Sequence, residues 1–143
     1  MNPFFQTAEL MRQLTRDEGL RLKPYMDTVG KLTIGVGRNL SDVGISGEEA
    51  QFLLEADVRK AVADVEKHLP WALALDQARL GALINCCFNL GIGGLLKFRH
   101  ALEALQAGNY GAAAEQFLDS EWASQVGPRA ARIAEQIRNG QWV

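Results

Sequence analysis

Apolar residues recur at helical spacing in the first segment of this chain. Thr7 is a candidate N-cap, Leu10 and Leu14 supply an apolar face, and Gly19 is a residue that commonly ends a helix. We therefore predict a helix over residues 7–18.

The pattern then changes to alternation. Tyr25–Asp27 and Thr33–Val36 are typical of two short strands, and Gly30 stands in the connection where a hairpin turn favours glycine. In the second strand the apolar residues point to one face, while Thr33 and Gly35 point to the other. A small antiparallel sheet is predicted.

Helical spacing returns at Ser46, which forms a serine-x-x-glutamate capping box with Glu49. This long helix runs to about Lys67, and Pro70 ends it. Glycine-containing breaks separate the later helices, which we predict over residues 77–90, 94–106, 110–118 and 128–139. The fold class is therefore α+β, with a small N-terminal sheet and a mostly helical remainder.

Composition narrows the function classes. With 143 residues and a net charge of −2, the chain lacks the basic footprint of a nucleic-acid binder. No apolar run reaches the ~20 residues of a membrane span. Glu9 and Arg12 interrupt the first segment, so we expect no signal peptide and synthesis in a cytoplasm. Cys86 and Cys87 are adjacent, which favours buried thiols over a disulfide or a metal site.

Two carboxylates and a threonine surround the predicted hairpin. Cleavage of a glycosidic bond needs one carboxyl that donates a proton and one that stays ionised near a water. Glu18 faces the negative end of its helix dipole, which together with partial burial would favour the neutral acid. Asp27, at a strand edge, would stay ionised, and the hydroxyl of Thr33 could hold a water beside it. Spacing alone leaves another interpretation open, in which Thr15 and Glu18 form a capping box and Asp27 merely opens the turn.

The motif around these residues resembles a known family. The run Glu18–Lys23, followed by Tyr25, Asp27-Thr28, Gly30 and Thr33–Gly37, closely resembles the T-even phage lysozymes, which are muramidases of glycoside hydrolase family 24. Further similarity is carried by residues 82–85 with Phe88 and Gly91, and by Trp122, residues 128–132 and residues 140–142.

This resemblance implies one two-lobed lysozyme-like domain over residues 1–143, with a cleft between the lobes. The small sheet lobe would comprise about residues 15–45, the linking helix about 46–69 and the helical lobe about 70–143. The helix over residues 7–18 would pack on the helical lobe. We expect a monomer without a metal or cofactor.

The resemblance also implies a reaction. The protein would be an endolysin that hydrolyses the β-1,4 bond between N-acetylmuramic acid and N-acetylglucosamine in peptidoglycan with inversion, for host cell lysis. Glu18 would be the acid, and Asp27 with Thr33 would position the water. A holin-type partner would permeabilise the membrane, so that the enzyme reaches the wall from the cytoplasm. Alternatives are a wall-remodelling muramidase and a glycan-binding relative without turnover.

Further residues receive roles by the same resemblance. Arg129 would orient Glu18; the alternative is an arginine near the start of a solvated helix, a position that the helix dipole does not favour. Arg38 would pair with Asp57 and hold the sheet to the long helix. Substrate contacts are expected at the following four positions: Gly37, Leu40, Phe88 and Asn89. Of these, Phe88 could equally belong to the core.

Overall fold

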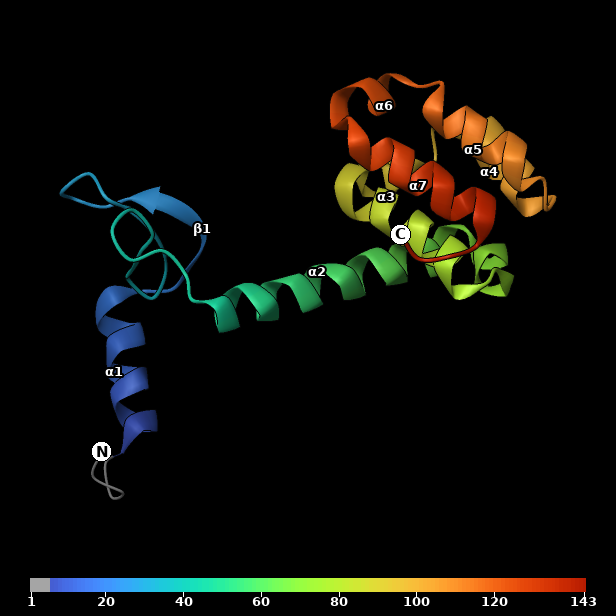
Figure 1. Ribbon diagram of the computed structural model, residues 1–143. Coiled ribbons are helices and arrows are strands. Elements are labelled where there is room, and N and C mark those ends of the chain that lie inside the picture. The colour runs from blue at the N-terminus through green and yellow to red at the C-terminus, as the bar shows by residue number, and fades with distance from the viewer. Residues whose placement is uncertain (1–5) are drawn as a thin grey trace. The chain divides into compact units, whose positions relative to one another are not determined.

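The computed structural model describes residues 6–143. Residues 1–5, which belong to the segment expected not to be a signal peptide, lie outside the described residues. The chain divides into two compact units, Met1–Phe52 and Leu53–Val143, here named the N-unit and the C-unit. Each is described by itself, and their elements are labelled in Figure 1.

The N-unit contains one helix and a three-stranded sheet. Its elements are α1 (Thr7–Glu18), β1 (Arg21–Met26), β2 (Leu32–Gly35) and β3 (Arg38–Asn39). The strands are antiparallel in the order β1-β2-β3, with Thr33 paired to Tyr25 on one side and to Asn39 on the other. Gly30 has a φ of 80° in the first hairpin, which confirms the predicted turn glycine. The helix and the hairpin are also present as predicted.

The helix α2 (Gly47–His68) begins in the N-unit and continues into the C-unit. Its capping box is reciprocal, as predicted. The Ser46 amide donates to Glu49 Oε2 at 2.7 Å, and the Glu49 amide donates to Ser46 Oγ at 3.1 Å. Two orphan N–H groups are thereby satisfied at the start of the helix.

All helices and turns after α2 belong to the C-unit, which contains no strand among its described residues. A small sheet followed by a helical remainder confirms the α+β fold class. Its remaining elements are η1 (Pro70–Ala74), α3 (Gln77–Leu95), α4 (Arg99–Gln106), α5 (Tyr110–Leu118), α6 (Glu121–Val126) and α7 (Pro128–Asn139). The elements η1 and α6 were not predicted because both are short. The predicted helix over residues 94–106 begins too early, since α3 continues past a kink at Gly91 (φ 73°) and α4 starts at Arg99.

A continuous hydrophobic core holds the C-unit together. Helix α5 packs against α4 and α7, and α3 packs against α7 (Figure 1). Phe98, Phe117 and Trp122 form an aromatic cluster, with ring centroids 5.0 to 6.3 Å apart. The largest fully buried side chains are Phe117, Leu83, Leu95, Leu105, Ile137, Val65 and Cys86.

Helix α3 has the length and composition of a membrane span, with 19 residues and a mean hydropathy of 1.2. The central helix of a folded core passes the same test. Here α3 is kinked at Gly91, and it buries Leu83, Cys86 and Leu95 in the core of the C-unit. We interpret it as a core helix. Cys86 and Cys87 are both buried free thiols, which confirms that prediction.

The N-unit buries very little by comparison. Among the described residues 6–52, Thr33 is the one buried residue, at 4% exposure. Leu10, Met11 and Leu14 on α1 are exposed. The packing of this helix on the helical lobe stays a prediction.

Candidate active site

Glu18 is the last residue of α1. Gly19 follows with a φ of 78°, and its amide donates to the Thr15 carbonyl at 2.9 Å, so the chain leaves the helix directly after the carboxylate. The Glu18 side chain is exposed and lies against the backbone of Gly37, where a Cβ atom would be 3.2 Å from Glu18 Oε2. Glu18 therefore has a defined neighbour within the N-unit, and its partial burial in the whole molecule stays a prediction.

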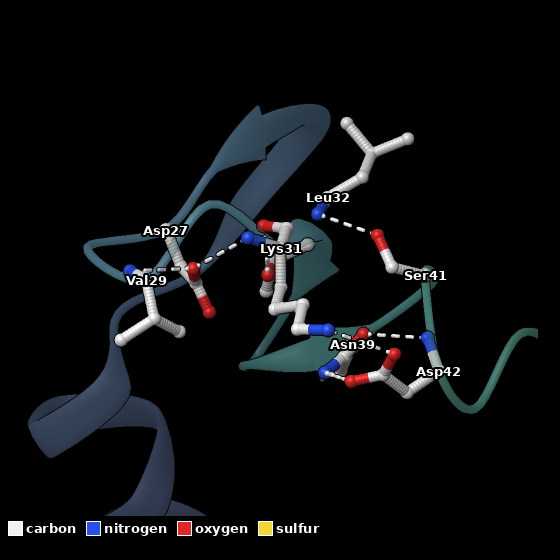
Figure 2. Close-up of polar contacts among 8 residues, drawn as sticks. Asp27, Val29, Lys31, Leu32, Asn39, Ser41 and Asp42 are labelled. Atoms are coloured by element: carbon white, nitrogen blue, oxygen red, sulfur yellow. Dashed lines mark hydrogen bonds and ion pairs between the residues drawn. The ribbon is translucent and has the colours of Figure 1, made fainter.

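Asp27 opens the hairpin between β1 and β2. Its Oδ1 accepts the amides of Val29 at 3.0 Å and Lys31 at 2.7 Å, and its own amide donates to the Lys31 carbonyl at 2.9 Å (Figure 2). No hydrogen bond or ion pair within the described part of the chain engages Oδ2. Asp27 both shapes the turn and keeps one oxygen available, so the two interpretations of this residue are compatible.

The Lys31 peptide group connects Asp27 to Thr33. Thr33 Oγ1 donates to the Lys31 carbonyl at 3.0 Å, and the Lys31 amide is the group that binds Asp27 Oδ1. Because its proton is committed to that carbonyl, the buried Thr33 hydroxyl can bind a water only as an acceptor. Sequence reasoning had not assigned Lys31 a role.

A second set of polar contacts braces the loop after β3. Lys31 Nζ donates to Asp42 Oδ1 at 3.1 Å, and Asn39 bonds Asp42 twice, through Nδ2 at 3.0 Å and by accepting the Asp42 amide at 2.9 Å (Figure 2). Ser41 Oγ accepts the Leu32 amide at 2.9 Å, and the Leu40 amide donates to the Leu32 carbonyl at 2.7 Å. Leu40 is thus held in the strand ladder.

Arg38 pairs with Glu49 in the structure, and the predicted Arg38–Asp57 pair, whose members belong to different units, stays a prediction. The Arg38 guanidinium binds Glu49 through both oxygens, at 2.8 and 2.7 Å. Hydrogen bonding to Arg38 lowers the pKa of Glu49 to about 2, and the same bond raises the pKa of Arg38. Glu49 lies in the first turn of α2, whereas Asp57 is eight residues later, about 12 Å further along the helix axis. Arg38 therefore holds the sheet to the start of α2.

The remaining predicted residues lie in the C-unit. The Asn89 Oδ1 atom accepts the indole N–H of Trp122 at 2.8 Å, so its amide N–H₂ is the part left for another partner. Phe88 is 44% exposed and is not plain core. It borders two hollows: an apolar one of about 430 Å³ that Trp142 also lines, and one of about 290 Å³ that Asp57 also lines.

Arg129, in the first turn of α7, is bound within the C-unit. Its Nε and Nη2 donate to Asn85 Oδ1 at 3.0 and 2.8 Å, and Nη2 also reaches the Asn85 carbonyl at 3.4 Å. It also lines the apolar hollow beside Phe88. Asn85 was quoted in the sequence motif, but its contact with a residue 44 positions away was not predictable from spacing.

The sequence matches the phage lysozyme family over residues 15–136. The chain belongs to the phage lysozyme family. This is a family of glycoside hydrolases of the muramidase type, so the resemblance seen around Glu18, Asp27 and Thr33 is confirmed for most of the chain.

The share of a relative's length that this chain covers differs among the individual relatives. The pre-baseplate central spike protein Gp5 of Enterobacteria phage T4 is 34% identical over 97% of this chain, which spans 28% of that protein. Probable T4-type lysozyme 1 of Dictyostelium discoideum is 26% identical over 93% of this chain and 95% of its own length. The endolysin of Salmonella phage P22 is 33% identical, over 74% of this chain and 76% of its own length.

Proposed function

We propose that this protein hydrolyses the β-1,4 bond between N-acetylmuramic acid and N-acetylglucosamine in peptidoglycan, with inversion at the anomeric carbon. The proposal rests on the hydrogen bonding of the Asp27 carboxylate. One of its oxygens is held by two backbone amides, and the other has no partner among the described residues. A carboxylate fixed in this way is suited to receiving a proton from a water at a constant position.

In the proposed reaction, Glu18 protonates the glycosidic oxygen as the bond to the anomeric carbon breaks. A water on the opposite face of the sugar attacks that carbon and gives up its proton to Asp27 Oδ2. Thr33 accepts the other hydrogen of the water, since its own proton is held by the Lys31 carbonyl. A lone pair of the water is then directed at the sugar.

The proposed attack of water on the face opposite the leaving group determines the anomeric configuration of the product. An inverting enzyme needs about 6.5–9.5 Å between its carboxyls, so that the water fits beside the sugar. We expect the α-anomer as the first product. A β-anomer in NMR spectra recorded within the first turnovers would contradict the water-bridged arrangement.

For the C-unit we propose substrate contacts at Phe88 and at the amide N–H₂ of Asn89, and orientation of Glu18 by Arg129. Gly37 and Leu40 would contribute from the N-unit. These assignments rest on the family resemblance. They fit the exposure of Phe88 and the amide N–H₂ of Asn89, which has no hydrogen-bond partner among the described residues.

The Glu18→Gln variant tests the catalytic proposal, because it preserves the size of the side chain and removes the transferable proton. Purified peptidoglycan should be cleared by the wild type and not by this variant, with circular dichroism spectra unchanged. Clearing by both proteins would remove Glu18 from the reaction. Clearing by neither, together with retention on the walls, would support a glycan-binding relative.

The biological setting that we propose is host lysis, with a holin-type protein giving access to the wall. The spike protein among the relatives favours a second candidate, local opening of the wall by a muramidase that is part of a larger assembly. Expression in a bacterial cytoplasm with and without a co-expressed holin separates the two. Lysis that requires the holin supports the endolysin role, whereas activity on purified walls without lysis in either case supports the second.

A further inference from the structure

Gly37 lies in the two-residue turn between β2 and β3, and the family resemblance predicts that it contacts the substrate. In the structure its neighbour is Glu18. A Cβ atom at Gly37 would be 3.2 Å from Glu18 Oε2, 3.4 Å from Cδ and 3.6 Å from Cγ. The first of these separations is tighter than ordinary van der Waals contact, so any side chain at this position would displace the carboxyl group.

We propose that Gly37 is a positioning residue for Glu18, and that its missing side chain lets the carboxyl group lie directly against the turn. The inference rests on the proposed function, in which Glu18 donates the proton to the glycosidic oxygen. Proton transfer requires the acid within hydrogen-bonding reach of that oxygen, and a misplacement of about 1 Å can lower the rate about 10²-fold.

The backbone conformation alone does not explain this glycine. Gly37 has a φ of 71°, a region in which glycine is preferred. Gly35, two residues earlier, has a φ of 68° and shares that preference, but a Cβ atom there would meet nothing within 4 Å. The two glycines therefore make the same backbone demand and differ in contact with Glu18. Gly35→Ala is a matched control for Gly37→Ala.

The contact itself is tested by thermal unfolding, without substrate. Gly37→Ala should lower Tm slightly more in the wild-type background than in the Glu18→Ala background, because the flexible Glu18 side chain accommodates most of the added Cβ atom and removing the carboxyl group relieves the remaining contact. Gly35→Ala should lower Tm equally in both. Equal losses for Gly37→Ala in the two backgrounds would overturn the proposal.

The catalytic consequence is tested by kinetics on soluble peptidoglycan fragments. Gly37→Ala should lower kcat by about tenfold or more, beyond any change in KM that follows from its proposed substrate contact. Gly35→Ala should leave kcat within about twofold. Equal losses of kcat in both variants would show that backbone strain, not the Glu18 contact, is responsible, and would overturn the proposal.

Asparagine provides a second pair of variants, since it tolerates a positive φ better than alanine does. Gly37→Asn and Gly35→Asn keep the comparison valid if either alanine variant fails to fold. A wild-type protein without activity would refute the proposed function and the catalytic role of Gly37 together. The unfolding comparison would still report separately whether Gly37 fixes the Glu18 side chain.

Discussion

The C-unit buries a hydrophobic core, whereas the described part of the N-unit buries Thr33 alone. The two units are therefore stabilised by different interactions. In the C-unit, apolar side chains from several helices fill one interior. In the N-unit, backbone pairing and side-chain hydrogen bonds around Asp27, Lys31 and Asp42 define the structure. The residues proposed for proton transfer all lie in the unit that polar contacts organise.

The largest effect is expected from truncating the C-unit core. Phe117 is fully buried and contacts the rings of Phe98 and Trp122. Phe117→Ala should lower the free energy of unfolding by about 3–5 kcal/mol, through lost burial and the cavity that remains. Denaturant unfolding measures this change.

Leu22→Ala is the control for that experiment, because Leu22 on β1 is 82% exposed. It should change the unfolding free energy by no more than about 0.5 kcal/mol. A loss at Leu22 comparable to that at Phe117 would mean that the N-unit depends on apolar burial as much as the C-unit does.

A smaller effect, confined to the N-unit, is expected at Asp27. Asp27→Ala removes the acceptor for the Val29 and Lys31 amides and should cost about 1 kcal/mol. Asp27→Asn keeps an acceptor oxygen, so the hairpin should persist while activity is lost. Hydrogen exchange at those two amides distinguishes the variants: it should accelerate in the alanine variant and stay near wild type in the asparagine variant. Fast exchange in both would show that the turn needs the negative charge.

The smallest effect is expected at the exposed Arg38–Glu49 pair. Hydrogen bonding to Arg38 lowers the pKa of Glu49 to about 2, so the pair stabilises the fold above the ordinary carboxyl range. This contribution should be lost as the pH falls toward 2. Glu49→Gln keeps an oxygen for the Ser46 cap but loses the charge, so its Tm should lie slightly below wild type at pH 7 and converge with it in acid. A Tm difference that persists at the lowest pH would assign the effect to the cap.

Local signals predicted most of the secondary structure. The helix over residues 7–18, the Ser46–Glu49 capping box, and the helix from Pro128 to Asn139 have the expected bounds, because each depends on residues within a few positions of one another. The short helix α6 was missed. Its six residues give too little periodicity, although Ser120 caps it by accepting the Ala123 amide.

Contacts between distant segments were harder to predict. The Asp57 assignment for Arg38 came from a resemblance and stays a prediction, whereas the Arg38–Glu49 pair forms because the first turn of α2 follows β3 closely. The Asn89–Trp122 hydrogen bond joins residues 33 positions apart, and no local pattern indicates it. The catalytic candidates were found because their motif is short and continuous.

The buried cysteines make local opening of the C-unit measurable by chemical labelling. Burial raises the pKa of Cys86 to about 12, and burial raises the pKa of Cys87 as well, so both thiols are protonated and shielded at neutral pH. An alkylating reagent would label Cys86 only when α3 separates from its neighbours, whereas Cys87 also lines the hollow of about 290 Å³ beside Asp57. The labelling rate would then report how often the core of the C-unit opens. It would not report opening of the N-unit, because neither cysteine belongs to it.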